Sequence, residues 1–399
     1  MKVLAISVIE LSLSDSRRGG TAVYIASLIK ALQEIAEVDL CLLNHDHNGL
    51  SWTRGNLIRL EIDPIPNLFV RQWLSWYVGV KPAVWRYTSK SLKSFLKKIA
   101  LKNYAAVIFL DENAAIYEKF LPVEMPKILV RHNLDSESIK LKKDSFFGYL
   151  RALSAKHLSR RFDRWTLRRF SKVTIGSESE QKILQTLGNP SSVSLLPTIT
   201  RFDIEQVLPN RRSVDEKSQK AIFIGDFKYP PNVEAVHWFI KCQEYFSPER
   251  LATLEVVLVG RSPPDIPSDC KINVVALGFV DDLSSVLSQC QLAIIPIVSG
   301  SGVKVKTLTL LASGLPVVTT SEGVEGINVT NGVDCLIADD QKSFSESVER
   351  LCSDSSFGDL LQTNGRKLIQ ENFSAQRQNE SLRNIISDAI KVHRIEEHA

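Results

Sequence analysis

Short apolar runs alternate along the chain with segments whose apolar residues recur every three to four positions. This alternation is typical of parallel sheets with crossover helices. In the first half, Ile25, Leu28, Ile29, Leu32 and Ile35 recur at helical spacing between two such runs. The strands expected there are 3–8, 38–43, 106–110, 128–130 and 173–175.

The second half repeats the alternation. Its expected strands are 221–224, 254–259, 272–276, 292–297, 316–319 and 335–337. Its expected helices begin near Asn232, Asp282, Val303 and Ser343. The pattern predicts an α/β protein with two Rossmann-like domains that face each other across a cleft, where ligands of such folds bind.

A polar, charged stretch, 209–220, separates the two halves and is typical of an interdomain linker. We therefore expect an N-terminal domain over 1–207, a linker over 208–218 and a C-terminal domain over 219–399. The last helix of the C-terminal domain is a candidate to pack back on the N-terminal domain.

Length and composition narrow the class of protein. A chain of 399 residues exceeds one hydrophobic core, and 44% hydrophobic with 24% charged residues is typical of globular domains. The six cysteines are scattered without a CxxC pair, which favours a reducing cytosol over a disulfide scaffold. No apolar run reaches the roughly 18 residues of a membrane span. Glu10 interrupts the first apolar run, which favours a buried strand over a signal peptide. These features predict a cytoplasmic protein.

The most informative segment is 296–320, PIVSGSGVKVKTLTLLASGLPVVTT. A strand ends, Gly300 and Gly302 bracket Ser301, and a helix follows directly. Glycines allow a ligand to approach the backbone, and the free amides of a first helical turn attract anions. Lys304 and Lys306 add two positive charges. The combination indicates a diphosphate site, with a plain tight turn and solvated lysines as the alternative.

GSGVKVKTLTLLASGLPVVTT, followed by EGVEGI and NGVDCLIADD, resembles the donor-binding domain of family 4 glycosyltransferases of the GT-B fold. FIGDFKYPPNVEAVHWF and VALGFVDDLSSVLSQCQLAIIPI are similar to two other parts of that domain. In the first half, RRGGTAVYIASLIKAL resembles the family's glycine loop and first helix, and LVRHNLDSES resembles its central His-Asn segment. The resemblance covers most of the chain and is weakest between about 44 and 102.

The resemblance implies roles for individual residues. His132 would lie near the transferred sugar, with a structural histidine at a strand end as the alternative. Asp111, Glu112 and Asn113 would bind acceptor hydroxyls or cap the following helix. The positions implied for the donor are Gly300, Ser301, Gly302, Val303, Lys304 and Lys306 at the pyrophosphate, Gly278, Phe279 and Val280 beside the base, and Gly19 and Gly20 at the phosphates from the other domain.

The chain departs from the family at three positions. Many members carry two glutamates where this chain has Ser301 and Thr309, and the second contacts the ribose. Thr309 therefore puts the ribose contact in question. Asp226 stands near the position where many members have a phosphate-binding arginine. In this chain that role would fall to Lys304 and Lys306.

The reaction implied by the resemblance moves a sugar from a nucleoside diphosphate sugar to a glycan or lipid-linked glycan, with retention of configuration. No Asp-x-Asp pair occurs in the chain. We therefore expect no metal and no cofactor, with lysines and helix amides stabilising the leaving diphosphate. The alternatives are a catalytically silent GT-B homologue that binds a nucleotide sugar or a partner, and a GT-B sugar-nucleotide epimerase.

Two segments are strongly basic. Residues 64–110 hold eight basic residues and no acid, and 140–172 hold eleven against two acids. Tryptophans and tyrosines between residues 73 and 87 interleave with the first set, and aromatic and basic side chains together suit an anionic bilayer. The expected partner is the inner face of a membrane, with a solvated surface as the alternative. Nucleic acid is disfavoured because no binding module accompanies the charge.

Overall fold

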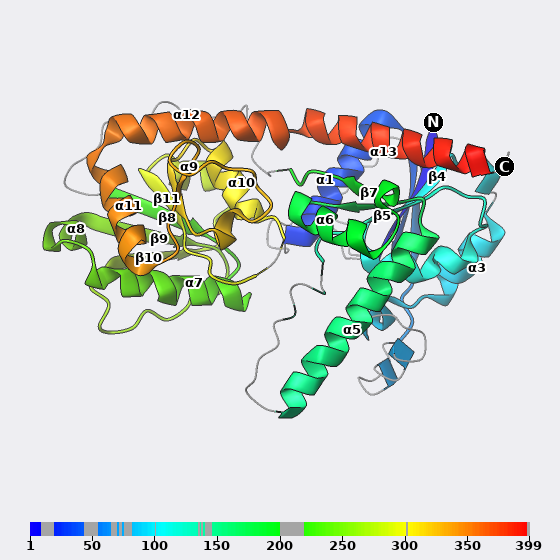
Figure 1. Ribbon diagram of the computed structural model, residues 1–399, viewed down its shortest axis with the longest axis horizontal. Coiled ribbons are helices and arrows are strands. Elements are labelled where there is room, and N and C mark those ends of the chain that lie inside the picture. Colours follow the sequence, from blue (N-terminus) through cyan, green and yellow to red (C-terminus); the bar gives the residue numbers. More distant parts are fainter. Residues whose placement is uncertain are drawn as a thin grey trace. The chain divides into compact units, whose positions relative to one another are not determined.

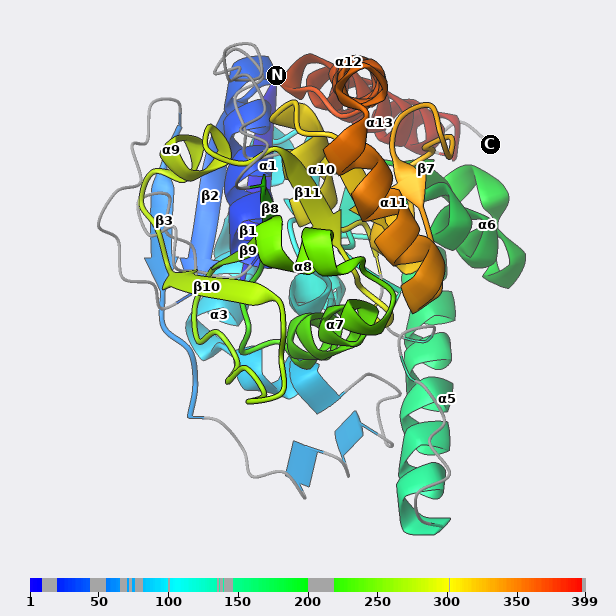
Figure 2. The ribbon, with the colours of Figure 1, turned by 90° about the vertical axis from the view of Figure 1, so that its left-hand side faces the viewer.

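The computed structural model describes residues 1–8, 20–43, 55–64, 70–71, 74–75, 82–99, 101–134, 136, 139, 146–199, 219–300 and 302–396. The chain forms two compact units, shown in Figures 1 and 2. Unit 1 comprises Met1–Pro197 and Ala375–Ala399, and unit 2 comprises Thr198–Ser374. The second unit is thus inserted in the sequence of the first.

Unit 1 contains a parallel sheet in the order β3-β2-β1-β4-β5-β6-β7. Strand order reverses between the neighbours β1 and β4, so the carboxyl ends of these two strands mark the switch point of the sheet. The strands are β1 (Lys2–Ser7), β2 (Glu37–Leu43), β3 (Leu57–Leu60), β4 (Ala106–Phe109), β5 (Lys127–Val130), β6 (Lys172–Ile175) and β7 (Val193–Leu195).

Both faces of this sheet are covered. Alternate residues of β1 enter different cores, because successive side chains of a strand point to opposite faces. Val3 and Ala5 pack with α1 (Gly20–Ile35) and α13 (Ala375–Glu396), whereas Leu4 and Ile6 join the core of the opposite face. That opposite core includes residues of α3 (Lys90–Lys98), η3 (Glu112–Phe120), α5 (Phe146–Arg169) and α6 (Glu178–Leu187). In Figure 1, α5 is a single long helix that extends beyond the sheet of its unit.

Unit 2 contains a second sheet, in the order β10-β9-β8-β11-β12-β13, whose strand pairs are all parallel. Its switch point lies between β8 and β11. The strands are β8 (Gln219–Ile224), β9 (Leu254–Val259), β10 (Asn273–Gly278), β11 (Leu292–Ile295), β12 (Val317–Thr319) and β13 (Leu336–Ile337).

Helices connect these strands and bury one continuous core. They are α7 (Pro230–Ile240), α8 (Pro248–Thr253), α9 (Leu283–Leu287), α10 (Val305–Ala312), α11 (Gln341–Ser353) and α12 (Ser355–Asn372). The expectation of two Rossmann-like domains is confirmed.

The strands predicted from sequence are all present, with shifts at their ends. β3 and β7 were not predicted. They have four and three residues, lie at the two edges of the sheet and are partly exposed, so neither forms a buried apolar run. The chain returns to unit 1 at Ala375, and Leu382 and Ile386 of α13 are buried in its core.

Candidate functional site

The glycine loop predicted as a phosphate site follows β11, at the switch point of unit 2. Gly300 and Gly302 have φ values of 132° and 72°, which side chains with a Cβ rarely adopt. These two residues turn the chain from the strand into α10. No side-chain hydrogen bond caps α10, whose N-cap is Lys304. The first-turn amides of α10 therefore lack a side-chain acceptor within the described part of the chain. Ser301 lies outside the described residues.

Lys306, in the first turn of α10, is partly buried. Its Nζ donates to Asn232 Oδ1 and lies 5.3 Å from the ring centroid of Phe223. No ion pair between Lys306 and a carboxylate occurs in the described parts of the chain. Burial and the adjacent charge of Lys304 lower the pKa of Lys306 to about 7. A negative charge beside this group would favour its charged form.

Lys304 differs from Lys306 because two carboxylates neutralise it. Its Nζ lies 3.2 Å from Glu322 Oε1 and 2.8 Å from Glu325 Oε2, and it also donates to Gly302 O. The glutamates belong to the segment after β12, so Lys304 ties that segment to the glycine loop. The sequence alone does not separate the two lysines, and the structure does.

The loops that follow β8, β9 and β10 are joined through their backbones. Gly225 N donates to Val259 O at 2.9 Å, and Gly260 N donates to Gly278 O at 2.7 Å. A Cβ on Gly260 would lie 1.6 Å from Gly225 O, so only glycine allows this approach. Phe279 and Val280, predicted beside the base, follow Gly278 and are partly exposed.

Two side chains of α7 contact the loops on both sides of the switch point. Asn232 Nδ2 donates to Asp226 O at 2.7 Å, while its Oδ1 accepts from Lys306. Glu234 Oε2 accepts from Ser299 Oγ at 2.5 Å. Sequence reasoning missed Asn232 and Glu234 as site residues, although both lie in the segment whose resemblance placed it in the donor domain. Their contacts depend on how α7 packs against the glycine loop, and the sequence alone does not show this packing.

Thr309 lies on α10 and is buried, and its Oγ1 donates to Val305 O at 2.9 Å. The Thr309 hydroxyl is thus bonded to its own helix, and threonine has no carboxylate that could accept hydrogen bonds from a ligand, as a glutamate would. Val303 is partly buried and packs against the core of unit 2. Neither side chain adds charge to the site.

Asp111 lies at the switch point of unit 1, directly after β4 and Leu110. Its Oδ1 accepts from Asn113 N and Ala114 N, so the carboxylate caps η3. Its Oδ2 accepts from Val8 N, directly after β1, at 3.0 Å. Burial raises the pKa of Asp111 to about 6, so the group is ionised at neutral pH. The structure thus places Asp111 in the capping role.

Glu112 and Asn113 belong to the first turn of η3 at this switch point. Glu112 is buried, and its Oε2 lies 3.9 Å from Arg131 Nε. Asn113 is only partly buried. Of the three residues predicted to bind an acceptor, Asn113 is the most accessible.

His132 follows β5, and its ring packs edge-on against Tyr24 of α1 with centroids 5.1 Å apart. Buried polar groups anchor the loop on both sides of this histidine. Arg131 Nη1 lies 2.6 Å from Asp163 Oδ1 of α5, and Leu134 N donates to Glu180 Oε1 of α6 at 2.8 Å. The position of His132 is therefore fixed by two helices of its own unit.

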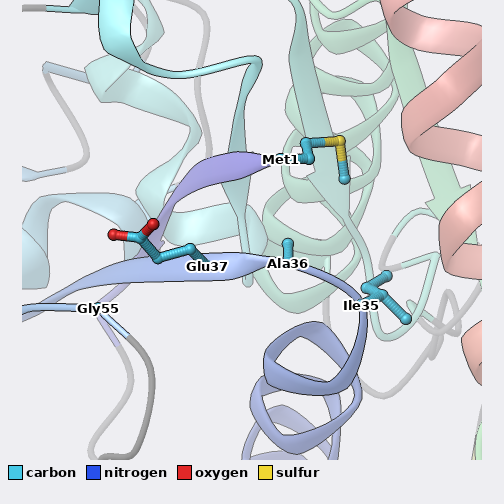
Figure 3. A pocket seen from close by; sticks show the side chains of 5 residues that line it. All are labelled: Met1, Ile35, Ala36, Glu37 and Gly55. Carbon is cyan, nitrogen blue, oxygen red and sulfur yellow. The ribbon is translucent and has the colours of Figure 1, made fainter.

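Gly20 begins α1, and Gly19 lies outside the described residues. Within the described ranges, no group of three or more His, Cys, Asp or Glu side chains could hold a metal ion. A cavity of about 400 Å³ is lined by Met1, Ile35, Ala36, Glu37 and Gly55 (Figure 3). It lies at the amino ends of β1 and β2, at the sheet edge opposite the switch point. Its acidic residue, Glu37, pairs with Lys2, so we assign it no ligand.

Comparisons with known proteins agree with this architecture. Residues 218–354 match the sequence model of the family described as Glycosyl transferases group 1. An uncharacterized 44.6 kDa protein in the cps region of Klebsiella pneumoniae is 22% identical over 166 residues. The aligned region spans 39% of this chain and 43% of that protein's own length.

Several solved structures match over nearly their whole lengths. Sucrose-phosphate synthase from Thermosynechococcus elongatus has a TM-score of 0.69 and 15% identity, covering 98% of this chain and 99% of that one. Anabaena HepE, in complex with UDP and glucose, has a TM-score of 0.61 and 14% identity, covering 97% and 99%. At such identities the likeness shows the fold alone, which is the GT-B fold of two Rossmann-like domains.

Proposed function

We propose that this chain transfers a sugar from a nucleoside diphosphate sugar to an acceptor, because residues 218–354 match the family Glycosyl transferases group 1. Support for the donor class comes from HepE, which shares the fold and was solved with UDP and glucose. The proposed donor site is the switch point of unit 2, between the ends of β8 and β11.

The observation that carries this proposal is the environment of Lys306. A partly buried ammonium whose polar contact is an amide oxygen, and whose pKa is lowered to about 7, is poorly compensated. A diphosphate beside it would supply the missing negative charge. Uncapped amides at the start of α10 would add hydrogen bonds to the same anion.

These groups suggest how the reaction proceeds. The bond between the anomeric carbon and the phosphate oxygen breaks, and negative charge grows on the leaving diphosphate. Lys306 and the α10 amides would stabilise that charge, as fixed donors do at other developing anions. We propose that this occurs without a metal and with retention of configuration. The acceptor hydroxyl attacks from the face that the diphosphate leaves, its oxygen bonds to the anomeric carbon, and its proton passes to the leaving phosphate oxygen.

We propose that unit 1 binds the acceptor, a glycan or lipid-linked glycan. Asn113 and His132 follow the neighbouring strands β4 and β5 at the carboxyl edge of the sheet, where ligands of open α/β sheets bind. Glu112, in the same turn as Asn113, is buried and contacts Arg131. The arrangement suits hydroxyl groups.

Calorimetric titration with UDP, GDP and ADP tests the donor class. One of the three should bind the natural protein, and the corresponding nucleotide sugar should be consumed when a glycan acceptor is supplied. If none of the three binds, the proposal fails. Binding without any turnover would favour the catalytically silent homologue. That homologue is the second candidate because Thr309 has no carboxylate to contact the donor.

The affinity for the diphosphate should depend on pH through Lys306. Its free-state pKa of about 7 means that it is charged below neutrality and increasingly neutral above it. A bound anion raises that pKa, so binding takes up a proton and weakens about tenfold per pH unit above 7 until the bound-state pKa is reached. Calorimetry between pH 7 and 9 checks this. Lys306→Arg, which does not titrate there, should bind with constant affinity.

We further propose that unit 1 docks on an anionic membrane surface, from the cytoplasmic side. Lys93 and Lys97 of α3 and Lys119 of η3 are exposed, and their Nζ atoms lie 5.2, 5.8 and 5.3 Å from the ring centroid of Phe120. No acid pairs with these three lysines in the described ranges. No helix of the described chain is long and apolar enough to cross a bilayer.

Reversing two charges of this cluster should weaken membrane binding. Each lysine near an anionic surface contributes about 1 kcal/mol, so Lys93→Glu with Lys97→Glu should lower partitioning at least about thirtyfold. Sedimentation with vesicles of equal parts phosphatidylcholine and phosphatidylglycerol measures it. Lys342→Glu with Lys367→Glu makes the same change of net charge on unit 2 and should have little effect. Equal binding of the natural protein to pure phosphatidylcholine would refute the electrostatic contact.

A further inference from the structure

Arg261 has no role in the site described so far. It lies two residues after β9, beside Asp226, which lies two residues after β8. The two strands are parallel neighbours, with Ile224 opposite Val259, so both residues stand at the carboxyl edge of the sheet. Arg261 Nη2 forms an ion pair with Asp226 Oδ2.

The backbone around Arg261 is rigidly held. Its carbonyl oxygen accepts from Phe227 N at 3.0 Å, so the β8–β9 ladder continues beyond both strands. Ser262 follows with a φ of 53°. Among the described residues other than glycine, it alone has a positive φ. Such strained backbone gathers at binding sites, because the surrounding structure must enforce it.

The Arg261 side chain keeps most of its hydrogen-bonding capacity. A guanidinium has five N–H donors in a planar fork, and the ion pair with Asp226 engages one nitrogen. The side chain is 31% exposed, so its other donors remain open to solvent and to a ligand. A planar fork with open donors suits a phosphate better than a point charge does.

One chain of polar contacts joins Arg261 to Lys306 across the switch point. Arg261 pairs with Asp226, the carbonyl of Asp226 accepts from Asn232, and Asn232 accepts from Lys306. This series of contacts begins at Arg261 after β9, continues through the loop after β8 and the first turn of α7, and ends at Lys306 in α10. Arg261 and Lys306 thus stand at the two ends of one series of contacts that crosses the switch point.

We infer that Arg261 is a second phosphate-binding residue of the donor site and that, together with Lys306, it grips the diphosphate of the nucleotide sugar. The inference rests on the proposed function. Arg261 would supply, from the loop after β9, a positive charge that Asp226 in the loop after β8 does not supply. Asp226 orients the guanidinium from beside it.

The test uses the full chain and two probes, namely the nucleotide among UDP, GDP and ADP that binds the natural protein, and inorganic pyrophosphate, which has no base. Arg261→Ala should weaken both about ten- to a hundredfold, the range of one charged hydrogen bond. Arg261→Lys should recover part of the loss, since it keeps the charge without the fork. The Arg261→Ala and Lys306→Ala losses should not add in the double variant if both residues hold one diphosphate.

Arg250→Ala is the matched control. Arg250 lies in α8 and bonds Gln219 Oε1 at 3.0 Å, at the amino end of the same sheet, so its loss should leave both affinities unchanged. Unchanged affinity of Arg261→Ala, with a clear loss in Lys306→Ala, would overturn the inference and leave the proposed function intact. A loss for the nucleotide but not for pyrophosphate would move Arg261 to the base or ribose and would also overturn it. If the natural protein binds neither probe, both proposals fall together.

Discussion

Asp163→Ala should destabilise unit 1 by about 3–5 kcal/mol, the cost of leaving a buried charge without its partner. Asp163 and Arg131 are both almost fully buried, with Oδ1 and Nη1 2.6 Å apart. Asp163 Oδ2 also accepts from Ser136 Oγ at 3.1 Å. The substitution therefore leaves a buried guanidinium without its closest carboxylate and a buried hydroxyl without this acceptor.

Denaturant unfolding followed by tryptophan fluorescence measures this effect, because five of the six tryptophans belong to unit 1. Glu346→Ala serves as the control. It breaks the exposed pair with Lys342 in unit 2 and should cost less than about 1 kcal/mol. A cost for Asp163→Ala no larger than the control's would show that water or a neighbour compensates Arg131. Arg131→Met with Asp163→Leu should recover much of the loss, since it removes both charges.

Lys306→Ala should weaken nucleoside diphosphate binding about ten- to a hundredfold, because a charged hydrogen bond contributes about 1.5–3 kcal/mol. The free energy of unfolding should not fall. The ammonium is partly buried beside Lys304, so its removal also relieves an uncompensated charge. Calorimetry and thermal unfolding of the same preparation separate the two effects.

Lys228→Ala is the control for general electrostatic attraction, since Lys228 is exposed in the loop after β8. Its affinity should change less than about threefold, as expected for a solvated surface charge. Equal losses in the two variants would mean that a diffuse positive field, rather than the Lys306 position, attracts the nucleotide. An unchanged affinity in Lys306→Ala would remove Lys306 from the site.

The two-domain fold could be predicted from sequence because most strands are continuous buried runs. Strands such as 254–259 and 292–295 show little exposure along their length, which is the condition under which apolar runs identify a strand. β3 fails this condition, since its residues 57–60 lie at the sheet edge with none fully buried. The last helix was expected as a candidate to pack back on the N-terminal domain, but the place where the chain returns, at Ala375, depends on long-range packing of Leu382 and Ile386.

The proposed donor site was predictable only where local sequence defines it. Gly300, Gly302 and Lys306 occur within one turn-to-helix segment, so their spacing is informative. Arg261 and Glu325 are more distant in sequence, and their relevance depends on contacts with Asp226 and Lys304. The sequence also gives Lys304 and Lys306 equal weight, because the glutamates that neutralise Lys304 arrive from beyond the next strand.

The insertion of unit 2 within unit 1 has a consequence for synthesis of the chain. Unit 2 is one continuous stretch, Thr198–Ser374, and has its own core, so it can fold as soon as it leaves the ribosome. Unit 1 needs α13, whose Leu382, Ile385 and Ile386 complete the core against α1 and β1. One face of its sheet therefore stays partly uncovered until α13 has been made. We expect a released chain truncated near residue 374 to hold a folded second domain and an unfinished first one that chaperones recognise.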